Sequence, residues 1–360
     1  EPRVALFVEP RDANRERWDG PRTGVERASD MFGIDDVFEA NQMQAVVDQW
    51  QSERQYETMV ATGPRALVAP GGGHSGGWTG APALTQLFEK QRLIKSASEI
   101  EAMHRSARVA ARAFVDVMRT AQAGDLEKSL SSALDHHCRR RGADRLSFPP
   151  VVANGAHALS LHYIANDQHI RDGDMVVFDG GCEMQGYCSD ITRTFPVAST
   201  FSETQKDVYE RVLDVNNKCI QMCDNSQYEK SFSIFSIQRH AERLLTEHLL
   251  DMKILKGTIE NNLQSRDFFR FYPHNIGHWL GMDTHDTHSI STSTALQPGM
   301  AITIEPGLYI DDGDDVPSKY HNICVRVEDN IVIQENAPAL VLTTDVPKTV
   351  SEIENLRQIA

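Results

Sequence analysis

Residues 274–286 have the sequence His-Asn-Ile-Gly-His-Trp-Leu-Gly-Met-Asp-Thr-His-Asp. Three histidines, His274, His278 and His285, fall within twelve residues and are interspersed with glycines and aspartates. A lone histidine is usually structural, but three at this spacing around glycines are poor material for a packed core. The segment also lacks the His-Glu-x-x-His pattern of a thermolysin-like zinc helix. We therefore predict that it forms part of a polar functional site.

Four acidic residues stand at the edges of strand-like segments on both sides of this block. Asp179 and Glu305 each end a short apolar run, Asp190 precedes another, and Glu328 lies within a fourth. An ionised carboxylate beside buried apolar residues is costly unless a cation pairs with it. Any one of these acids would more often be a surface residue, but four of them near a histidine favour a metal cluster.

The donor types indicate which metal such a cluster would hold. Four carboxylates and one imidazole form a hard, oxygen-rich ligand set, which suits manganese or a similar divalent ion better than thiolate-preferring metals. Four carboxylates carry a charge of −4, which two divalent ions would balance. We therefore expect two divalent metal ions, preferably manganese.

The overall composition excludes several classes of protein. The formal net charge of −15 argues against a nucleic-acid-binding surface. No apolar run approaches the roughly 18 residues that a membrane-spanning helix needs, so we expect no membrane partner. The six cysteines follow no paired zinc spacing, and we expect them to be reduced thiols.

Two domains are predicted from the pattern of apolar runs, with a boundary near residue 90. Residues 1–70 alternate short apolar runs with polar stretches, as a small α/β unit would. We therefore expect a partial α/β domain over residues 1–90 and a larger domain over residues 91–360. The glycine-rich residues 71–80 lack the ending of a phosphate-binding loop, and we expect a surface loop there.

Within the larger domain, capping patterns predict where helices begin. Ser96 or Ser98, each followed by a glutamate three residues later, would start one helix, and Ser202 with Gln205 would start a second. A third helix is expected at about 234–250. Helices followed by strand pairs occur twice, which predicts two similar halves. The expected strands cover residues 175–178 and 191–195 in the first half, and 301–304 and 325–327, continuing into 331–333, in the second.

Several motifs together resemble those of one known family. They are Leu161-His162-Tyr163 followed by Asn166, Asp179-Gly180-Gly181-Cys182-Glu183, Ser189-Asp190-Ile191-Thr192-Arg193-Thr194, the block 274–286, Thr303-Ile304-Glu305-Pro306-Gly307-Leu308-Tyr309, Arg326-Val327-Glu328-Asp329 and Trp18-Asp19-Gly20-Pro21-Arg22. They resemble the aminopeptidase P group of pita-bread metallopeptidases, the Xaa-Pro aminopeptidases, and within it the eukaryotic Xaa-Pro aminopeptidase 3 subgroup. This resemblance implies an α+β fold, with a pita-bread catalytic domain preceded by a partial α/β amino-terminal domain.

The resemblance also implies roles for individual residues. Asp190 and Glu328 would bridge two metal ions, and Glu305 would in addition accept a proton from the attacking water. The expected metal ligands are Asp179, Asp190, His278, Glu305 and Glu328. The expected catalytic residues are His162, His274, His285, Glu305 and Arg326, and the expected substrate-binding residues are His162, His285, Tyr309 and Arg326.

The activity implied by the resemblance is hydrolysis of the bond between the first residue of a peptide and a proline at position two. Two alternatives remain open at the level of sequence. One is a prolidase, which would cleave only Xaa-Pro dipeptides, and the other is a catalytically inactive pita-bread binding protein. We also expect a homodimer, located in mitochondria, in the cytoplasm or in both.

Overall fold

The computed structural model describes residues 4–12, 16, 22–34, 36–52, 58–59, 77–78, 81–224 and 232–358. The chain divides into two compact units, Glu1–Thr85 and Gln86–Ala360. Of the Trp18 to Arg22 motif only Arg22 lies within the described residues. In the predicted surface loop 71–80, the described residues Gly77–Trp78 form a short strand.

The first unit contains a parallel strand pair connected through a helix. Strand β1 (Ala5–Val8) pairs with β2 (Asp36–Glu39), and helix α2 (Gly24–Phe32) lies between them in sequence. Parallel strands need such a crossover, because a tight turn cannot bring them together. The remaining elements of this unit are η1 (Ala40–Gln42), α3 (Met43–Ser52), β3 (Thr58–Met59) and β4 (Gly77–Trp78).

The long helix α5 (Ala97–Thr120) of the second unit begins directly after Ser96, one of the two predicted starting residues. The Ser96 side chain accepts a hydrogen bond from the Glu99 backbone, and the Glu99 side chain accepts one from the Ser96 backbone. Helix α7 (Glu203–Met222) begins with the same reciprocal arrangement of Ser202 and Gln205. Both starts follow from local sequence, because a capping box satisfies backbone groups within a single turn.

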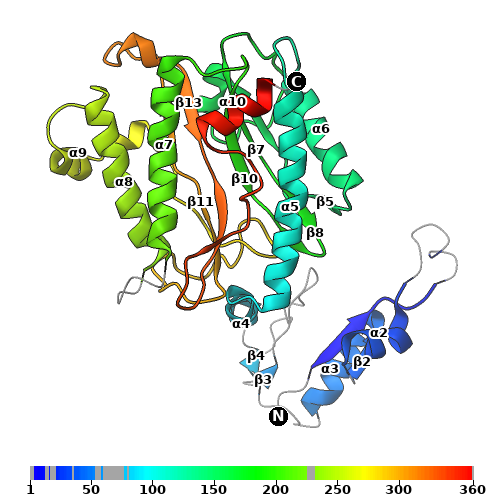
Figure 1. The fold of residues 1–360 in the computed structure, drawn as a ribbon. Helices are drawn as coiled ribbons and strands as arrows, with labels where there is room; N and C mark the ends of the chain where they lie inside the picture. The colour runs from blue at the N-terminus through cyan, green and yellow to red at the C-terminus, as the bar shows by residue number, and fades with distance from the viewer. Residues whose placement is uncertain are drawn as a thin grey trace. The chain divides into compact units, whose positions relative to one another are not determined.

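The helices of this unit lie around and against several small antiparallel sheets. Figure 1 shows α5 and α7 running alongside the strands, with the shorter α10 between these two helices. One sheet has the order β10-β7-β6 and another the order β11-β14-β15, while β12 pairs with β13. The strands are β6 (Val151–Asn154), β7 (Met175–Gly180), β10 (Ile191–Pro196), β11 (Ala301–Ile304), β12 (Gly307–Ile310), β13 (Ile323–Arg326), β14 (Asp329–Val332) and β15 (Leu340–Val341). The other helices of this unit are α6 (Glu127–Arg140), α8 (Ile234–Asp251), α9 (Ile259–Ser265) and α10 (Val350–Gln358), and helix α4 (Ala81–Leu93) contains the boundary between the two units. The short strands are β5 (Arg145–Leu146), β8 (Cys182–Met184) and β9 (Tyr187–Cys188). The 3-10 turns are η2 (Gly155–Leu159), η3 (Asp267–Arg270) and η4 (Ser318–Tyr320).

A continuous apolar core joins the helices to the strands. Phe114 of α5 contacts Phe178 of β7, with ring centroids 4.5 Å apart, and both side chains are fully buried. All six cysteines lie within the described residues, where they are buried and form no disulfide. Among the described residues, no helix combines the length and the apolar character needed to span a membrane.

One strand prediction is wrong in a way that matters for the site. The sequence suggested that the strand at 325–327 continues into 331–333, but the structure breaks it between Arg326 and Asp329. Before the break the chain pairs with β12, and after the break it pairs with β11. The consecutive strands β11 and β12, which face this break, are interrupted at the same level by Glu305 and Pro306. Proline has no backbone N–H and cannot donate a hydrogen bond to a neighbouring strand. The two interruptions face each other.

The backbone at Gly181, directly after β7, packs closely against the backbone of Ser189. A Cβ added at Gly181 would overlap the backbone oxygen of Ser189, whereas one at Gly180 would crowd the flexible end of the Leu134 side chain and lie at ordinary contact distance from Pro150. We expect Gly181→Ala to destabilise the metal-free protein by about 3 kcal/mol, because backbone must move. Gly180→Ala is the matched control and should cost less. Thermal unfolding of both variants measures the difference, and equal unfolding temperatures would contradict it.

Candidate metal centre

The acidic candidates lie where strands end or change partner. Asp179 is the next-to-last residue of β7 and stands opposite Thr192 of β10. Asp190 directly precedes β10. Glu305 follows β11, and Glu328 occupies the break between β13 and β14. The antiparallel pairings therefore bring together carboxylates that lie far apart in sequence.

The candidate ligands converge on one point. Ligand atoms of Asp190, His278 and Glu328 all lie within 4.8 Å of one another. His278 Nε2 lies 3.4 Å from Asp190 Oδ2 and 3.8 Å from Glu305 Oε1. Asp179 lines the same cavity, whose volume is about 720 Å³. The five residues that were expected as metal ligands thus surround a single site.

Three carboxylate oxygens of this site are buried without a hydrogen-bond partner among the described residues. They are Oδ1 of Asp179, Oδ1 of Asp190 and Oε1 of Glu328. A buried acceptor that has lost its water is costly, and more so when it carries charge. Three such oxygens beside an imidazole form a donor set suited to a divalent cation. The residues present therefore fit a metal centre.

The ionisation of the protein groups supports the same conclusion. Burial raises the pKa of Asp179 to about 6, despite the opposing effect of Arg326. Burial raises the pKa of Glu305 to about 7, and burial together with the Asp190 charge raises the pKa of Glu328 well above its usual value. These carboxyl groups cannot all be ionised cheaply without a cation, and a bound divalent ion would reverse the direction of these shifts.

The pKa of His278 is also raised, which for an imidazole favours the charged form. Burial lowers its pKa, but the hydrogen bond to Asp190 and the Glu305 charge outweigh burial and raise the pKa to about 9. Without a metal ion, the imidazole is therefore a cation among carboxylates. A metal ligand must be neutral imidazole, so metal binding would release this proton.

Arg326, Tyr309 and His274 form a hydrogen-bonded chain along one side of the site. Arg326 donates through Nη2 to Asp179 Oδ2 at 2.6 Å and through Nη1 to the Tyr309 hydroxyl at 2.7 Å. The hydroxyl is 2.9 Å from His274 Nε2, and His274 Nδ1 is 2.8 Å from the carbonyl oxygen of Asn275. Because that carbonyl can only accept, Nδ1 carries the hydrogen and Nε2 accepts from Tyr309.

His274 stays neutral over the physiological pH range. Burial and the neighbouring Arg326 charge lower its pKa to about 3. The ring therefore adds no positive charge beside the candidate ligands, and its orientation is set by hydrogen bonds at both nitrogens.

His162 and His285 also line the cavity, and both side chains are exposed. The His285 ring lies 4.4 Å from the His278 ring, centroid to centroid, in an edge-to-face arrangement. The positions of both rings leave them accessible to a molecule that enters the cavity. Tyr309 does not line the cavity itself, and it reaches the site through Arg326 and His274.

Two residues of the site were missed by sequence analysis. Thr192 donates from its hydroxyl to Glu328 Oε2 at 2.7 Å and accepts from Arg326 Nε at 3.0 Å, so it orients a candidate ligand. Its place two residues after Asp190 was the available signal. His288 lines the cavity three residues after His285, and its residue type was the signal there.

Comparisons with known proteins agree with this geometry. Residues 101–335 match the model of metallopeptidase family M24, and residues 1–60 match the amino-terminal domain of aminopeptidase P. Human Xaa-Pro aminopeptidase 3 is 38% identical over 98% of this chain and 70% of its own length. Xaa-Pro aminopeptidase of Haemophilus influenzae is 34% identical over 98% of this chain and 81% of its own.

Solved structures show the same relationship. The structure of Pseudomonas aeruginosa aminopeptidase PepP superposes with a TM-score of 0.84 at 32% identity, over 98% of this chain and 82% of that one. A variant of Escherichia coli aminopeptidase P in complex with substrate gives a TM-score of 0.85 at 28% identity, with the same coverage of 98% and 82%. The chain therefore belongs to metallopeptidase family M24, within its aminopeptidase P group.

Proposed function

We propose that this protein is a metal-dependent aminopeptidase that removes the first residue of peptides whose second residue is proline. The observation that carries the proposal is the convergence of four acidic side chains and His278 on one cavity, with buried carboxylate oxygens that lack protein partners. The related chains that are named Xaa-Pro aminopeptidase support the substrate class.

We further propose that two divalent ions, preferably manganese, occupy the site. Asp179, Asp190, His278, Glu305 and Glu328 would hold them. Bound divalent cations would lower the pKa of a water molecule and polarise the scissile carbonyl group. The ligand set supports manganese because it is rich in oxygen.

The protein's own groups would bind and orient the peptide and move its protons. Glu305 lies at the cavity wall and would accept a proton from the attacking water. His162 and His285 are exposed to the cavity and would contact the substrate. His274 would hold Tyr309 and Arg326 in place, since both of its ring nitrogens are engaged. In this tautomer Nε2 carries no hydrogen, so a donor role toward the developing negative charge would require the other tautomer, with the hydrogen on Nε2.

The cavity itself favours an aminopeptidase over a prolidase. An Xaa-Pro bond has no N–H, so the proline ring must be recognised by shape, and apolar side chains such as Phe148, Trp279 and Ile290 line the cavity. Among the described lining residues, Arg326 is the one arginine or lysine, and Asp179, Tyr309 and Thr192 already engage it. A prolidase typically uses a cation to hold the free carboxylate of the proline residue itself.

We also propose a homodimer and a location in mitochondria, in the cytoplasm or in both. The plant relative named intermediate cleaving peptidase 55, mitochondrial, from Arabidopsis thaliana, is 34% identical over 94% of this chain and supports the mitochondrial location. The homodimer is proposed from the family resemblance of the motifs.

Removal of metal should abolish activity. After exhaustive chelation, we expect no cleavage of an Xaa-Pro-Yaa tripeptide. Manganese should restore more activity than zinc, because the donors are mostly carboxylates, and more than magnesium, because one donor is an imidazole. Product analysis after each addition measures this. Undiminished turnover in a sample shown to be metal-free would rule the metal mechanism out.

Replacement of His274 or His285 by alanine should lower kcat/KM by roughly a hundredfold, about 3 kcal/mol, because each would act on substrate or its neighbours rather than hold metal. Metal content should remain at the wild-type level. His240→Ala, on α8 and outside the cavity lining, is the control and should leave both quantities unchanged. Loss of a metal ion from either variant would show that the assigned roles are wrong.

Substrate length separates the two candidate peptidase activities. We expect a higher kcat/KM for Xaa-Pro-Yaa tripeptides than for Xaa-Pro dipeptides, because no unengaged arginine or lysine of the described lining is available to hold the free carboxylate of the proline residue. A matched Xaa-Ala-Yaa tripeptide controls for the proline requirement. A clear preference for the dipeptide would make the enzyme a prolidase and would leave the metal assignment intact.

A further inference from the structure

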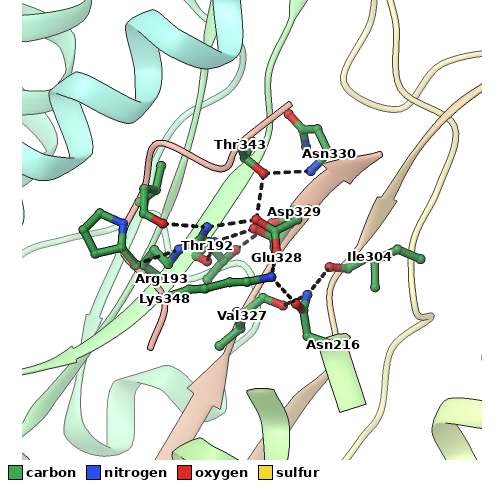
Figure 2. Close-up of polar contacts among 12 residues, drawn as sticks. Thr192, Arg193, Asn216, Ile304, Val327, Glu328, Asp329, Asn330, Thr343 and Lys348 are labelled. Atoms are coloured by element: carbon green, nitrogen blue, oxygen red, sulfur yellow. Dashed lines mark hydrogen bonds and ion pairs between the residues drawn. The ribbon is translucent and has the colours of Figure 1, made fainter. Parts of the chain in front are cut away.

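Lys348 lies behind the candidate metal centre, in the segment that connects β15 to α10. This position is outside residues 101–335, which match the family model. Its ammonium group donates to Asp329 Oδ2 at 2.8 Å and to Asn216 Oδ1 at 3.0 Å (Figure 2). The Lys348 side chain is 25% exposed, whereas Asp329 and Asn216 are fully buried. One cation at the edge of the core therefore joins two buried polar groups.

Asn216 connects Lys348 to the two strand ends that carry Glu305 and Glu328. From helix α7, its Nδ2 donates to the carbonyl oxygen of Ile304 at 3.1 Å and to that of Val327 at 3.3 Å (Figure 2). These carbonyl groups belong to the residues directly before the two glutamates. The amide of Asn216 thus holds both interrupted strands at the level where the candidate ligands emerge, and Lys348 fixes the amide orientation by binding its oxygen.

Asp329 provides a second connection, immediately after Glu328. Its carboxylate accepts from Lys348, from Arg193 Nη2 at 2.9 Å and from the Thr343 hydroxyl at 2.7 Å. Arg193 is fully buried and also donates to the carbonyl oxygen of Glu328 at 2.6 Å. The backbone on both sides of Glu328 is therefore held by a network in which Lys348 is the member nearest to solvent.

We propose that Lys348 is a positioning residue for the metal centre, which acts through Asn216 and Asp329 to set the spacing of Glu305 and Glu328. The proposal rests on the proposed function, because it assumes that these glutamates hold metal. Groups that orient metal ligands commonly change metal affinity by about ten- to a hundredfold when they are replaced.

The charge of Lys348 and its positioning role should change metal affinity in opposite directions. The direction of the change in metal affinity after its replacement therefore distinguishes the two effects. A positive charge near four carboxylates disfavours a bound cation, and its removal would by charge alone tighten metal binding. Loss of positioning would weaken metal binding. A weaker affinity after removal of the charge can therefore not come from the charge itself.

The test compares Lys348→Met with Lys206→Met in the full chain. Lys206 lies on α7 with a 43% exposed side chain, 4.0 Å from Glu210, so its replacement removes the same charge from the same unit. The metal-free proteins are titrated with Mn²⁺ by calorimetry, and their thermal unfolding is recorded. We expect K348M to raise the Kd for Mn²⁺ by about tenfold or more, while K206M matches the wild type. Lys348→Arg, which keeps the charge and the donors, should recover most of the affinity.

The outcomes separate this proposal from the proposed function. A Kd in K348M equal to or lower than that of the wild type overturns the positioning role, whatever happens to the unfolding temperature. A wild-type protein that does not bind Mn²⁺ overturns the metal centre instead. If K348M does not fold, the Asn216→Asp variant is titrated with Mn²⁺ instead. This variant keeps the oxygen that accepts from Lys348 but loses the Nδ2 hydrogen bonds to the carbonyl oxygens of Ile304 and Val327. A wild-type Kd in N216D would then be the contradicting result.

Discussion

The repulsion among buried carboxylates is the constraint on which the rest of this structure depends. Asp179, Asp190, Glu305 and Glu328 share one cavity with His278, and several of their oxygens have no partner among the described residues. Bringing such groups together costs free energy that a divalent cation offsets. The fully ionised carboxylates are therefore stable together only when a cation is bound. The surrounding protein must hold these acids in place against their mutual repulsion.

The surrounding hydrogen bonds provide that restraint through the backbone. The Asn330 side chain binds Asp190 twice, by accepting from its backbone nitrogen at 3.1 Å and by donating to its carbonyl oxygen at 2.5 Å. Arg193 holds the carbonyl of Glu328, and Thr192 holds its side chain. These contacts leave Asp190 Oδ1 and Glu328 Oε1 without a partner in the described part of the chain and so available to a ligand.

A separate set of contacts restrains the loop that carries the histidines. Asp286 directly follows His285 and is buried between Lys95 Nζ, 3.4 Å away, and Arg92, which also binds Asp283 at 2.6 Å. Arg92 at the end of α4 and Lys95 after it thus hold this loop in place. The acidic side chains of the candidate centre and the loop that carries His278 and His285 are therefore held by different sets of contacts.

Sequence alone determined the elements whose causes are local. The capping boxes at Ser96 and Ser202 start helices where predicted, because they act within one turn. The carboxylate-rich set of candidate residues also indicated a divalent metal centre, because the metal preference of a ligand atom depends on the residue type alone. Only the tertiary structure placed Glu328 in a strand break opposite Glu305, and only it brought Asn216 and Lys348 behind them. Those arrangements depend on pairings between distant segments, which no local pattern encodes.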